Sequence, residues 1–253
     1  MKGKIVKLTV FYVLLIGIWQ GVAELHIWPS YLFPSPLGVA QSLIAGFEDN
    51  SFTIGILVSM KRVLIGFGLS IVGGVLIGLA IGRVKLLDET IGSIVLGFQA
   101  LPSICWLPVA LLWFGLSENA IVMVVVLGSL FAITIGVDSG VKNVPPIYLR
   151  AARTMGAGGF DLYTRVIIPA AMPSIISGLK QGWSFAWRAL MAGELLYVSI
   201  GLGHLLTMGR ELNDISQVMA VMIIIIVIGI TVDRLVFTKL ENRVRERWGL
   251  LNA

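Results

Sequence analysis

The long apolar stretches of this chain constrain its fold more than any other feature. Five apolar runs lack Asp, Glu, Lys and Arg and contain 16 to 28 residues each. A helix needs roughly 20 apolar residues to cross the hydrocarbon core of a membrane, which is about 30 Å thick. The five runs are 8–23, 63–82, 90–117, 119–137 and 215–232. They predict membrane-spanning helices, with the third run broken by Pro102 and Pro108.

The composition supports an integral membrane protein. Apolar residues make up 57% of the 253-residue chain and charged residues only 13%, whereas soluble domains carry about 25%. The net charge of +5 does not indicate a nucleic-acid partner, because the basic residues lie at the ends of apolar runs without interleaved aromatic residues. The only cysteine, Cys105, has no disulfide partner within the chain and is expected to be a small packing residue.

A sixth span is expected at about 173–199, although it contains Lys180, Arg188 and Glu194. The predicted fold is therefore all-α and polytopic, with six transmembrane helices in one domain covering 1–253. The expected spans are about 8–28, 61–82, 90–115, 119–137, 173–199 and 215–236.

The basic residues predict the orientation of these spans. Short cytoplasmic loops collect Lys and Arg, and a cytoplasmic N-terminus puts fourteen of the nineteen Lys and Arg residues on the cytoplasmic side. Six spans then put both termini in the cytoplasm, together with the loop 138–172. The pair Lys61-Arg62 is the exception, and we expect it to reach the lipid headgroups.

The N-terminal segment has an alternative interpretation as a signal peptide. Lys2, Lys4 and Lys7 precede its apolar run, and the small residues at 21–23 could be a cleavage site. Removing it would leave five spans. The run is long for the apolar region of a signal peptide, so a membrane span is favoured.

Glycines recur every fourth residue in two of the expected spans. Gly74, Gly78 and Gly82 lie in the second span, and Gly178 and Gly182 lie in the fifth. Small residues at this spacing let helix backbones approach closely in membranes. The pattern predicts a compact helical bundle.

The segment from Lys142 to Pro173 is basic and predicts two short helices. Pro145 or Pro146 can begin the first helix, with Asn143 as its cap, and the run 147–155 contains no helix breaker. Gly158-Gly159 then interrupts the chain, and a second helix is expected from about Phe160 to near Pro169. We name residues 147–168 the elbow.

The elbow carries a family resemblance. Ala151-Ala152, three further residues, Gly156-Ala157 and later Ile167-Ile168-Pro169 resemble the EAA loop of ABC importer permeases. The sequences LFPSPLGV (32–39), FQALPSICWLPVALLWFGLSENA (98–120) and GLKQGWSFAWRALMAGELL (178–196) resemble the nitrate, sulfonate, taurine and bicarbonate group of these permeases. The resemblance covers nearly the whole chain. Two residues depart from the motif: Arg150 replaces its glutamate, and Gly158 occupies a position that is commonly Ser.

The resemblance implies a type I importer bundle in the cell membrane of a prokaryote. It implies a homodimer, cytoplasmic ABC ATPase subunits and an extracytoplasmic substrate-binding protein as partners, with ATP and Mg²⁺ used by the ATPase and no cofactor in this chain. The loop residues that would contact the ATPase through a coupling helix are Arg150, Ala151, Ala152, Arg153, Gly156, Ala157, Asp161 and Pro169.

The sequence does not have the motifs of an ATPase or a metalloenzyme. It lacks the G-x-x-x-x-G-K-[ST] loop that holds nucleotide phosphates, and it lacks H-E-x-x-H and clustered Cys and His. We therefore expect a transporter subunit rather than an enzyme, and ATP hydrolysis by a separate partner.

Arg188 and Glu194 are candidates for the translocation pathway, because ionisable groups within a span default to a functional hypothesis. They are separated by about 240° around a straight helix, so they cannot pair with each other. The expected cargo is a small anion of the nitrate, sulfonate, taurine or bicarbonate class. A vitamin or pyrimidine precursor carried by the same machinery is an alternative, and a stand-alone secondary transporter is a weaker one.

Overall fold

A computed structural model describes residues 2–29, 31–196 and 199–247, and every regular element in this part of the chain is a helix. The chain divides into two compact units. Among the described residues, unit 1 contains 2–29, 31–59 and 199–227, and unit 2 contains 60–196 and 228–247. The all-α prediction is thereby confirmed for the part of the chain that the structure describes.

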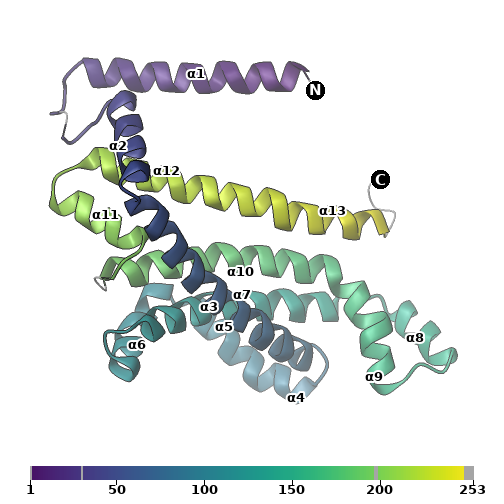
Figure 1. The fold of residues 1–253 in the computed structure, drawn as a ribbon. Coiled ribbons are helices and arrows are strands. Elements are labelled where there is room, and N and C mark those ends of the chain that lie inside the picture. Colours follow the sequence, from purple (N-terminus) through teal and green to yellow (C-terminus); the bar gives the residue numbers. More distant parts are fainter. Residues whose placement is uncertain (1, 30, 197–198, 248–253) are drawn as a thin grey trace. The chain divides into compact units, whose positions relative to one another are not determined.

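Unit 1 begins with α1 (Lys2–Glu24) and α2 (Pro36–Glu48). Its other elements are the start of α3 (Ser51–Ile81), α11 (Leu202–Glu211) and most of α12 (Ile215–Val232) (Figure 1). The hydroxyl of Ser35 accepts the Gly38 N–H at 3.2 Å and caps α2, which starts at Pro36. The buried Ser59 hydroxyl accepts the Leu202 N–H at 2.9 Å and so joins α3 to the start of α11.

Unit 2 holds the rest of α3 and most of the remaining helices, including π-helical turns at η1, η3 and η4 and a 3₁₀ turn at η2. Its elements are α4 (Lys85–Leu87), η1 (Asp88–Gly92), α5 (Ser93–Gln99), η2 (Ser103–Trp106), α6 (Leu107–Phe114), α7 (Glu118–Lys142), α8 (Pro146–Thr154), α9 (Gly159–Leu162), η3 (Tyr163–Ile167), α10 (Ile168–Leu196), η4 (Asp233–Phe237) and α13 (Thr238–Arg247).

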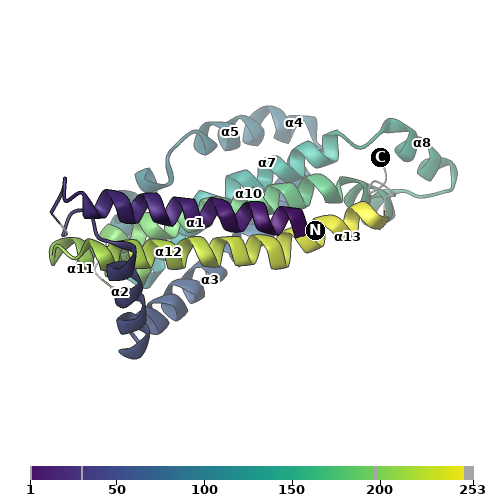
Figure 2. The same ribbon diagram turned by 90° about the horizontal axis from the view of Figure 1, so that it is seen from above.

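The core of unit 2 is the pair α7 and α10, which lie side by side in both views (Figures 1 and 2). Glycines make this approach possible, because a Cβ atom on Gly178 would lie 2.9 Å from the Cα atom of Gly136. A Cβ on Gly182 would likewise meet the side chain of Ile133. The predicted packing role of Gly178 and Gly182 is confirmed.

Helix α3 and the turn that follows it pack on α7 through the other predicted glycines. A Cβ on Gly74 or Gly82 would come within 2.8 Å of a side chain of α7, and one on Gly78 within 2.7 Å. The hydroxyl of Ser129 in α7 donates to the hydroxyl of Ser70 in α3 at 2.7 Å, with both groups buried. Close backbone contact and an interhelical hydrogen bond are the devices that hold helices together in lipid.

Five helical segments in the described residues are long and apolar enough to cross a membrane, and a bent pair brings the number to six if it is one span. The first of these helices ends at Glu24, before the expected end of the span at 28. The bent pair corresponds to the expected third span: Lys85–Gln99 and Ser103–Phe114 meet at 105°. The bend occurs beside Pro102, whereas Pro108 lies in the first turn of α6 and does not break it.

The expectation that the second helix of the elbow ends near Pro169 is wrong. The chain is helical without interruption from Gly159 to Leu195, and Pro173 lies inside α10. Proline lacks an N–H and its ring clashes with a regular helix. The wide turn η3 ends at Ile167, two residues before Pro169, and the chain stays helical there. Within the expected loop 138–172, α7 continues to Lys142 and α10 begins at Ile168.

Candidate functional site

The turn of the elbow ends α8 with a double hydrogen bond. The Ala157 N–H donates to the Ala152 carbonyl at 2.9 Å, and the Gly156 N–H donates to the Arg153 carbonyl at 3.0 Å. Gly156 has a φ of +84°, the left-handed conformation that this Schellman motif requires and that glycine adopts without strain. The second helix then starts after Gly158, whose extended backbone provides the expected N-cap geometry.

The exposed surface of the elbow combines positive charge with large apolar side chains. Arg150 and Arg153 are exposed, and neither forms an ion pair with any residue in the described part of the chain. Met155 is 82% exposed and Phe160 is 81% exposed. Asp161, the only acidic residue of the elbow, is already paired with Arg165 at 3.2 Å. The surface is therefore positively charged and apolar, and it is uncovered in this chain.

The remaining predicted residues of the elbow divide between surface and interior. Ala151 and Gly156 are exposed, while Ala157 and Pro169 are half-buried. Ala152 is only 3% exposed, so its small side chain packs inside this protein and is not at the surface of the elbow. Asn143 caps the end of α7 and does not cap the start of α8, where Pro145 precedes the first residue.

Helix α10 carries a polar face. Ser177, Gln181, Ser184 and Arg188 are all exposed, and their spacing places them within about 60° of one another around the helix. The opposite side of α10 is buried and aromatic, with Trp183 packed against Phe67 and Phe237. The guanidinium carbon of Arg188 lies 5.3 Å from the ring centroid of Phe185.

Glu194 lies in a different environment from Arg188. It is 1% exposed, and its carboxylate accepts a hydrogen bond at 3.0 Å from Arg62, itself 3% exposed. Arg62 also donates to Glu118 at the start of α7, at 3.1 Å. The sequence did not indicate this group of charges, because Arg62 and Glu194 are 132 residues apart and Arg62 was expected at the lipid headgroups.

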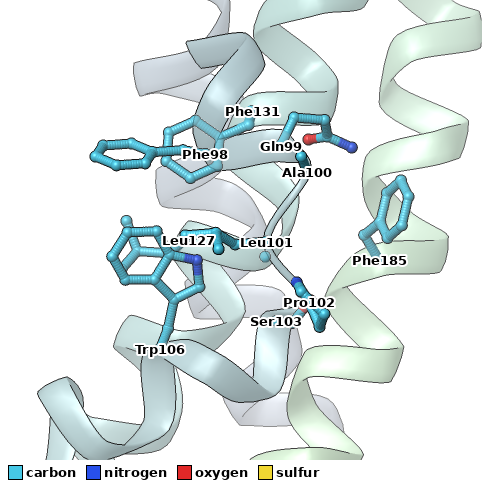
Figure 3. Close-up of a pocket in the computed structure, with 11 residues that line it drawn as sticks. Phe98, Gln99, Ala100, Leu101, Pro102, Ser103, Trp106, Leu127, Phe131 and Phe185 are labelled. Atoms are coloured by element: carbon cyan, nitrogen blue, oxygen red, sulfur yellow. The ribbon is translucent and has the colours of Figure 1, made fainter. Parts of the chain in front are cut away.

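The bend of the third span contains a cavity of about 230 Å³ (Figure 3). Its polar lining groups are the side chains of Gln99, Ser103 and Trp106, and none of the described lining residues is charged. The Gln99 side chain extends from the end of α5 towards α10, whose Phe185 ring faces the bend (Figure 3). The cavity therefore lies beside the helix that carries Arg188. The prolines of this run indicated a break, but nothing in the sequence indicated a cavity.

Comparison with known proteins assigns the chain to a family. Residues 70–246 match the family model described as "Binding-protein-dependent transport system inner membrane component". A protein of Methanocaldococcus jannaschii that carries the name ABC transporter permease protein is 34% identical over 87% of this chain and 84% of its own length. The taurine transport system permease protein of Escherichia coli is 26% identical over 87% and 82% of the two chains. The nitrate import permease protein of a Synechocystis strain is 26% identical over 92% of this chain and 87% of its own length.

Solved structures share the fold. An amino acid ABC transporter matches with a TM-score of 0.66 and 18% identity over 79% of this chain and 97% of that one. An inward-facing methionine ABC transporter matches with a TM-score of 0.66 and 17% identity over 77% of this chain and 96% of that one. The bundle therefore has the type I importer permease fold, and the family name implies a binding protein and an ATPase as partners. The helices, the family model and these likenesses together show that this chain belongs to the binding-protein-dependent inner membrane components, as a multi-pass permease subunit of a prokaryotic ABC importer.

Proposed function

We propose that two copies of this chain form the translocation path of an ABC importer for a small anion, with the polar face of α10 lining the path. The observation that carries the proposal is the row Ser177, Gln181, Ser184 and Arg188, exposed along a helix long and apolar enough to cross a membrane. Polar and charged side chains in a span face the bundle interior or a water-filled cavity. One chain leaves this row uncovered, so a second copy is needed to enclose it.

Arg188 supports an anionic cargo. Its guanidinium forms no ion pair with any described residue, so its positive charge is available to a passing solute. Two similar permeases are named for the transport of taurine, which carries an anionic sulfonate group, and of nitrate, which is an anion. Glu194, whose carboxylate is bonded to Arg62, instead acts as a positioning residue that holds α10 to α3.

The elbow is the contact with the ATPase in this proposal. Met155 and Phe160 provide apolar contact area, and Arg150 and Arg153 provide unpaired charge. Both termini lie in the cytoplasm with the elbow, as the distribution of Lys and Arg favours. ATP and Mg²⁺ bind to the ATPase, and closure of its two subunits moves the two bundles by a rigid-body transition.

Uptake into vesicles tests the proposal. The chain is reconstituted with its ATPase and its binding protein, and uptake of nitrate, taurine, bicarbonate and an alkanesulfonate is measured with and without ATP. Arg188→Gln is expected to lower uptake at least about tenfold, because it removes the charge from the path, while Arg188→Lys retains part of it. Arg243→Gln, at an exposed position of α13, is the matched control. Anion uptake by the chain alone without ATP, or normal uptake by Arg188→Gln, would contradict the proposal.

A further inference from the structure

The bend in the third span exposes groups that lipid cannot satisfy. Irregular backbone at membrane depth is tolerated only where protein buries it or where it lines a water-filled cavity. Here α5 ends at Gln99, and Ala100, Leu101 and Pro102 are exposed on the chain. The carbonyl groups of Ala100 and Leu101 accept no hydrogen bond from any residue that the structure describes. The 105° bend therefore belongs beside water or a polar ligand and not beside acyl chains.

Three side-chain hydrogen-bond donors at the bend lack partners. The Gln99 amide, the Ser103 hydroxyl and the Trp106 indole N–H line the cavity. None of the three forms a hydrogen bond with any residue in the described part of the chain. Figure 3 shows Gln99 and Trp106 on the two arms of the bend, with Ser103 between them in the chain. Groups of this kind, gathered in one cavity, provide donors for the oxygen atoms of a ligand.

The charge around the cavity favours an anion. No carboxylate lies among its described lining residues. Phe185 forms part of the wall of the cavity. The guanidinium carbon of Arg188 lies 5.3 Å from the centroid of the Phe185 ring. Uncharged hydrogen-bond donors with a neighbouring cation would bind an anion weakly enough for it to dissociate again, which a site on a transport path requires.

The size of the cavity favours a small ligand. Its volume of about 230 Å³ lies below the range of about 300–1,000 Å³ found for sites of drug-sized ligands. Aromatic rings of Phe98, Phe131 and Phe185 restrict it further. A compact oxyanion, or the sulfonate head of a longer solute, suits this space better than a vitamin precursor does.

We propose that this cavity is a recognition site for a small oxyanion within the transport path, in which Gln99, Ser103 and Trp106 donate hydrogen bonds to its oxygens and Arg188 supplies the opposing charge. The inference rests on the proposed function, because it places the site on the path beside α10. It adds the residues that would select the cargo, on a different helix from the polar face.

Thiol labelling tests the site without requiring that the cargo be known. Cys105 is the only cysteine and does not line the cavity, so Cys105→Ser provides a cysteine-free parent, in the complex with its ATPase. Ser103→Cys then places a thiol in the cavity. Ser93→Cys is the matched control, because Ser93 lies earlier in the same span, in a separate cavity with a net negative lining. The charged residues of that lining are Asp88, Glu89, Asp138 and Lys142. Each thiol is treated with an anionic reagent, 2-sulfonatoethyl methanethiosulfonate, and with a cationic reagent, 2-trimethylammonioethyl methanethiosulfonate. The rate of labelling by each reagent is divided by the rate at which the same reagent labels a free thiol in solution.

At Ser103→Cys we expect the anionic reagent to react about tenfold faster than the cationic reagent, because the unpaired positive charge of Arg188 lies nearby. Nitrate should slow the reaction of the anionic reagent. Ser93→Cys should favour the cationic reagent. Arg188→Gln should remove the anion preference and Arg188→Lys should retain it, while Gln99→Leu should weaken the protection by nitrate. Equal rates of the two reagents at Ser103→Cys, or no protection by nitrate or ethanesulfonate, would overturn the recognition site.

The two proposals can fail separately. ATP-driven uptake by the Cys105→Ser parent tests the proposed function. Thiol labelling measures the charge preference of the cavity whether or not uptake occurs. Uptake without anion preference at position 103 would reject the recognition site and retain the importer. Anion preference and nitrate protection without uptake of any anion would support the site and reject the proposed cargo class.

Discussion

Arg62 donates a hydrogen bond from Nη1 to Oε1 of Glu194 at 3.0 Å, and both side chains are almost fully buried. The pair joins α3 to α10, and Arg62 extends the contact to Glu118 at the start of α7. Three helices of unit 2 therefore meet at one group of charges. Removing one partner of a buried ion pair leaves an uncompensated charge, which destabilises a protein more than removing both partners does.

Glu194→Leu is expected to destabilise the protein by about 3 kcal/mol, because the buried Arg62 then loses a buried partner of opposite charge. The double variant Arg62→Met/Glu194→Leu should be more stable than the single variant. Thermal unfolding in detergent measures these two variants and the single variant Arg62→Met. Lys85→Gln, which breaks the exposed pair of Lys85 and Glu89, is the control and should change stability by less than about 1 kcal/mol. A double variant whose loss equals the sum of the two single losses would argue against a coupled pair.

Gly178→Ala should loosen the pair α7 and α10. The added Cβ would lie 2.9 Å from the Cα of Gly136. Because this neighbour is a backbone atom, it cannot move aside by a change of rotamer as a side chain can. Overpacking of this kind costs about 1–3 kcal/mol, which thermal unfolding detects. Gly97→Ala is the matched control, since nothing lies within 4 Å of its added Cβ and alanine favours a helix. Equal stability of the two variants would show that the helices can separate without loss.

Gly156→Arg is expected to leave the protein inserted in the membrane and to abolish ATP-coupled uptake. The residue needs a left-handed conformation, at a φ of +84°, which costs a non-glycine residue about 1–2 kcal/mol, and its side chain would project from the turn of the elbow. ATP-driven uptake and membrane content are measured together. Gly158→Ser, with ordinary backbone angles and an added capping hydroxyl, should transport normally. Normal uptake by Gly156→Arg would refute a docking role for the elbow.

Arg150→Glu should weaken the association of the permease with its ATPase about tenfold, because a partner surface complementary to the unpaired Arg150 carries negative charge. Arg150→Gln should have a smaller effect, and high salt should reduce the difference between the variants. Co-purification across a salt series measures the association. Arg165→Gln is the control, because Arg165 is paired with Asp161 within the chain. Tighter association of Arg150→Glu would indicate that the partner surface is positive.

The sequence predicted the features that depend on neighbouring residues. The lengths of the apolar runs indicated the long helices, and the residues around Gly156 predicted a short helix followed by a turn, because caps and turns are formed by residues a few positions apart. The glycine spacing predicted which faces of α3 and α10 pack closely. Arg188 was singled out, together with Glu194, as an ionisable residue within a span, and it lies on an exposed polar face. Its role in the path stays a prediction.

Features that depend on distant residues required the tertiary structure. The chain gives no local sign that Glu194 pairs with Arg62, that Ala152 packs inward or that helix continues through Pro169 and Pro173. The cavity at the bend exists because Gln99, Ser103 and Trp106 meet residues of α7 and α10 there. Hydrophobic length and capping are local properties, so the sequence by itself determined a helical membrane protein with a basic elbow. Which charges are neutralised and which remain available to a solute depends on contacts between separate helices, and only the tertiary structure decided them.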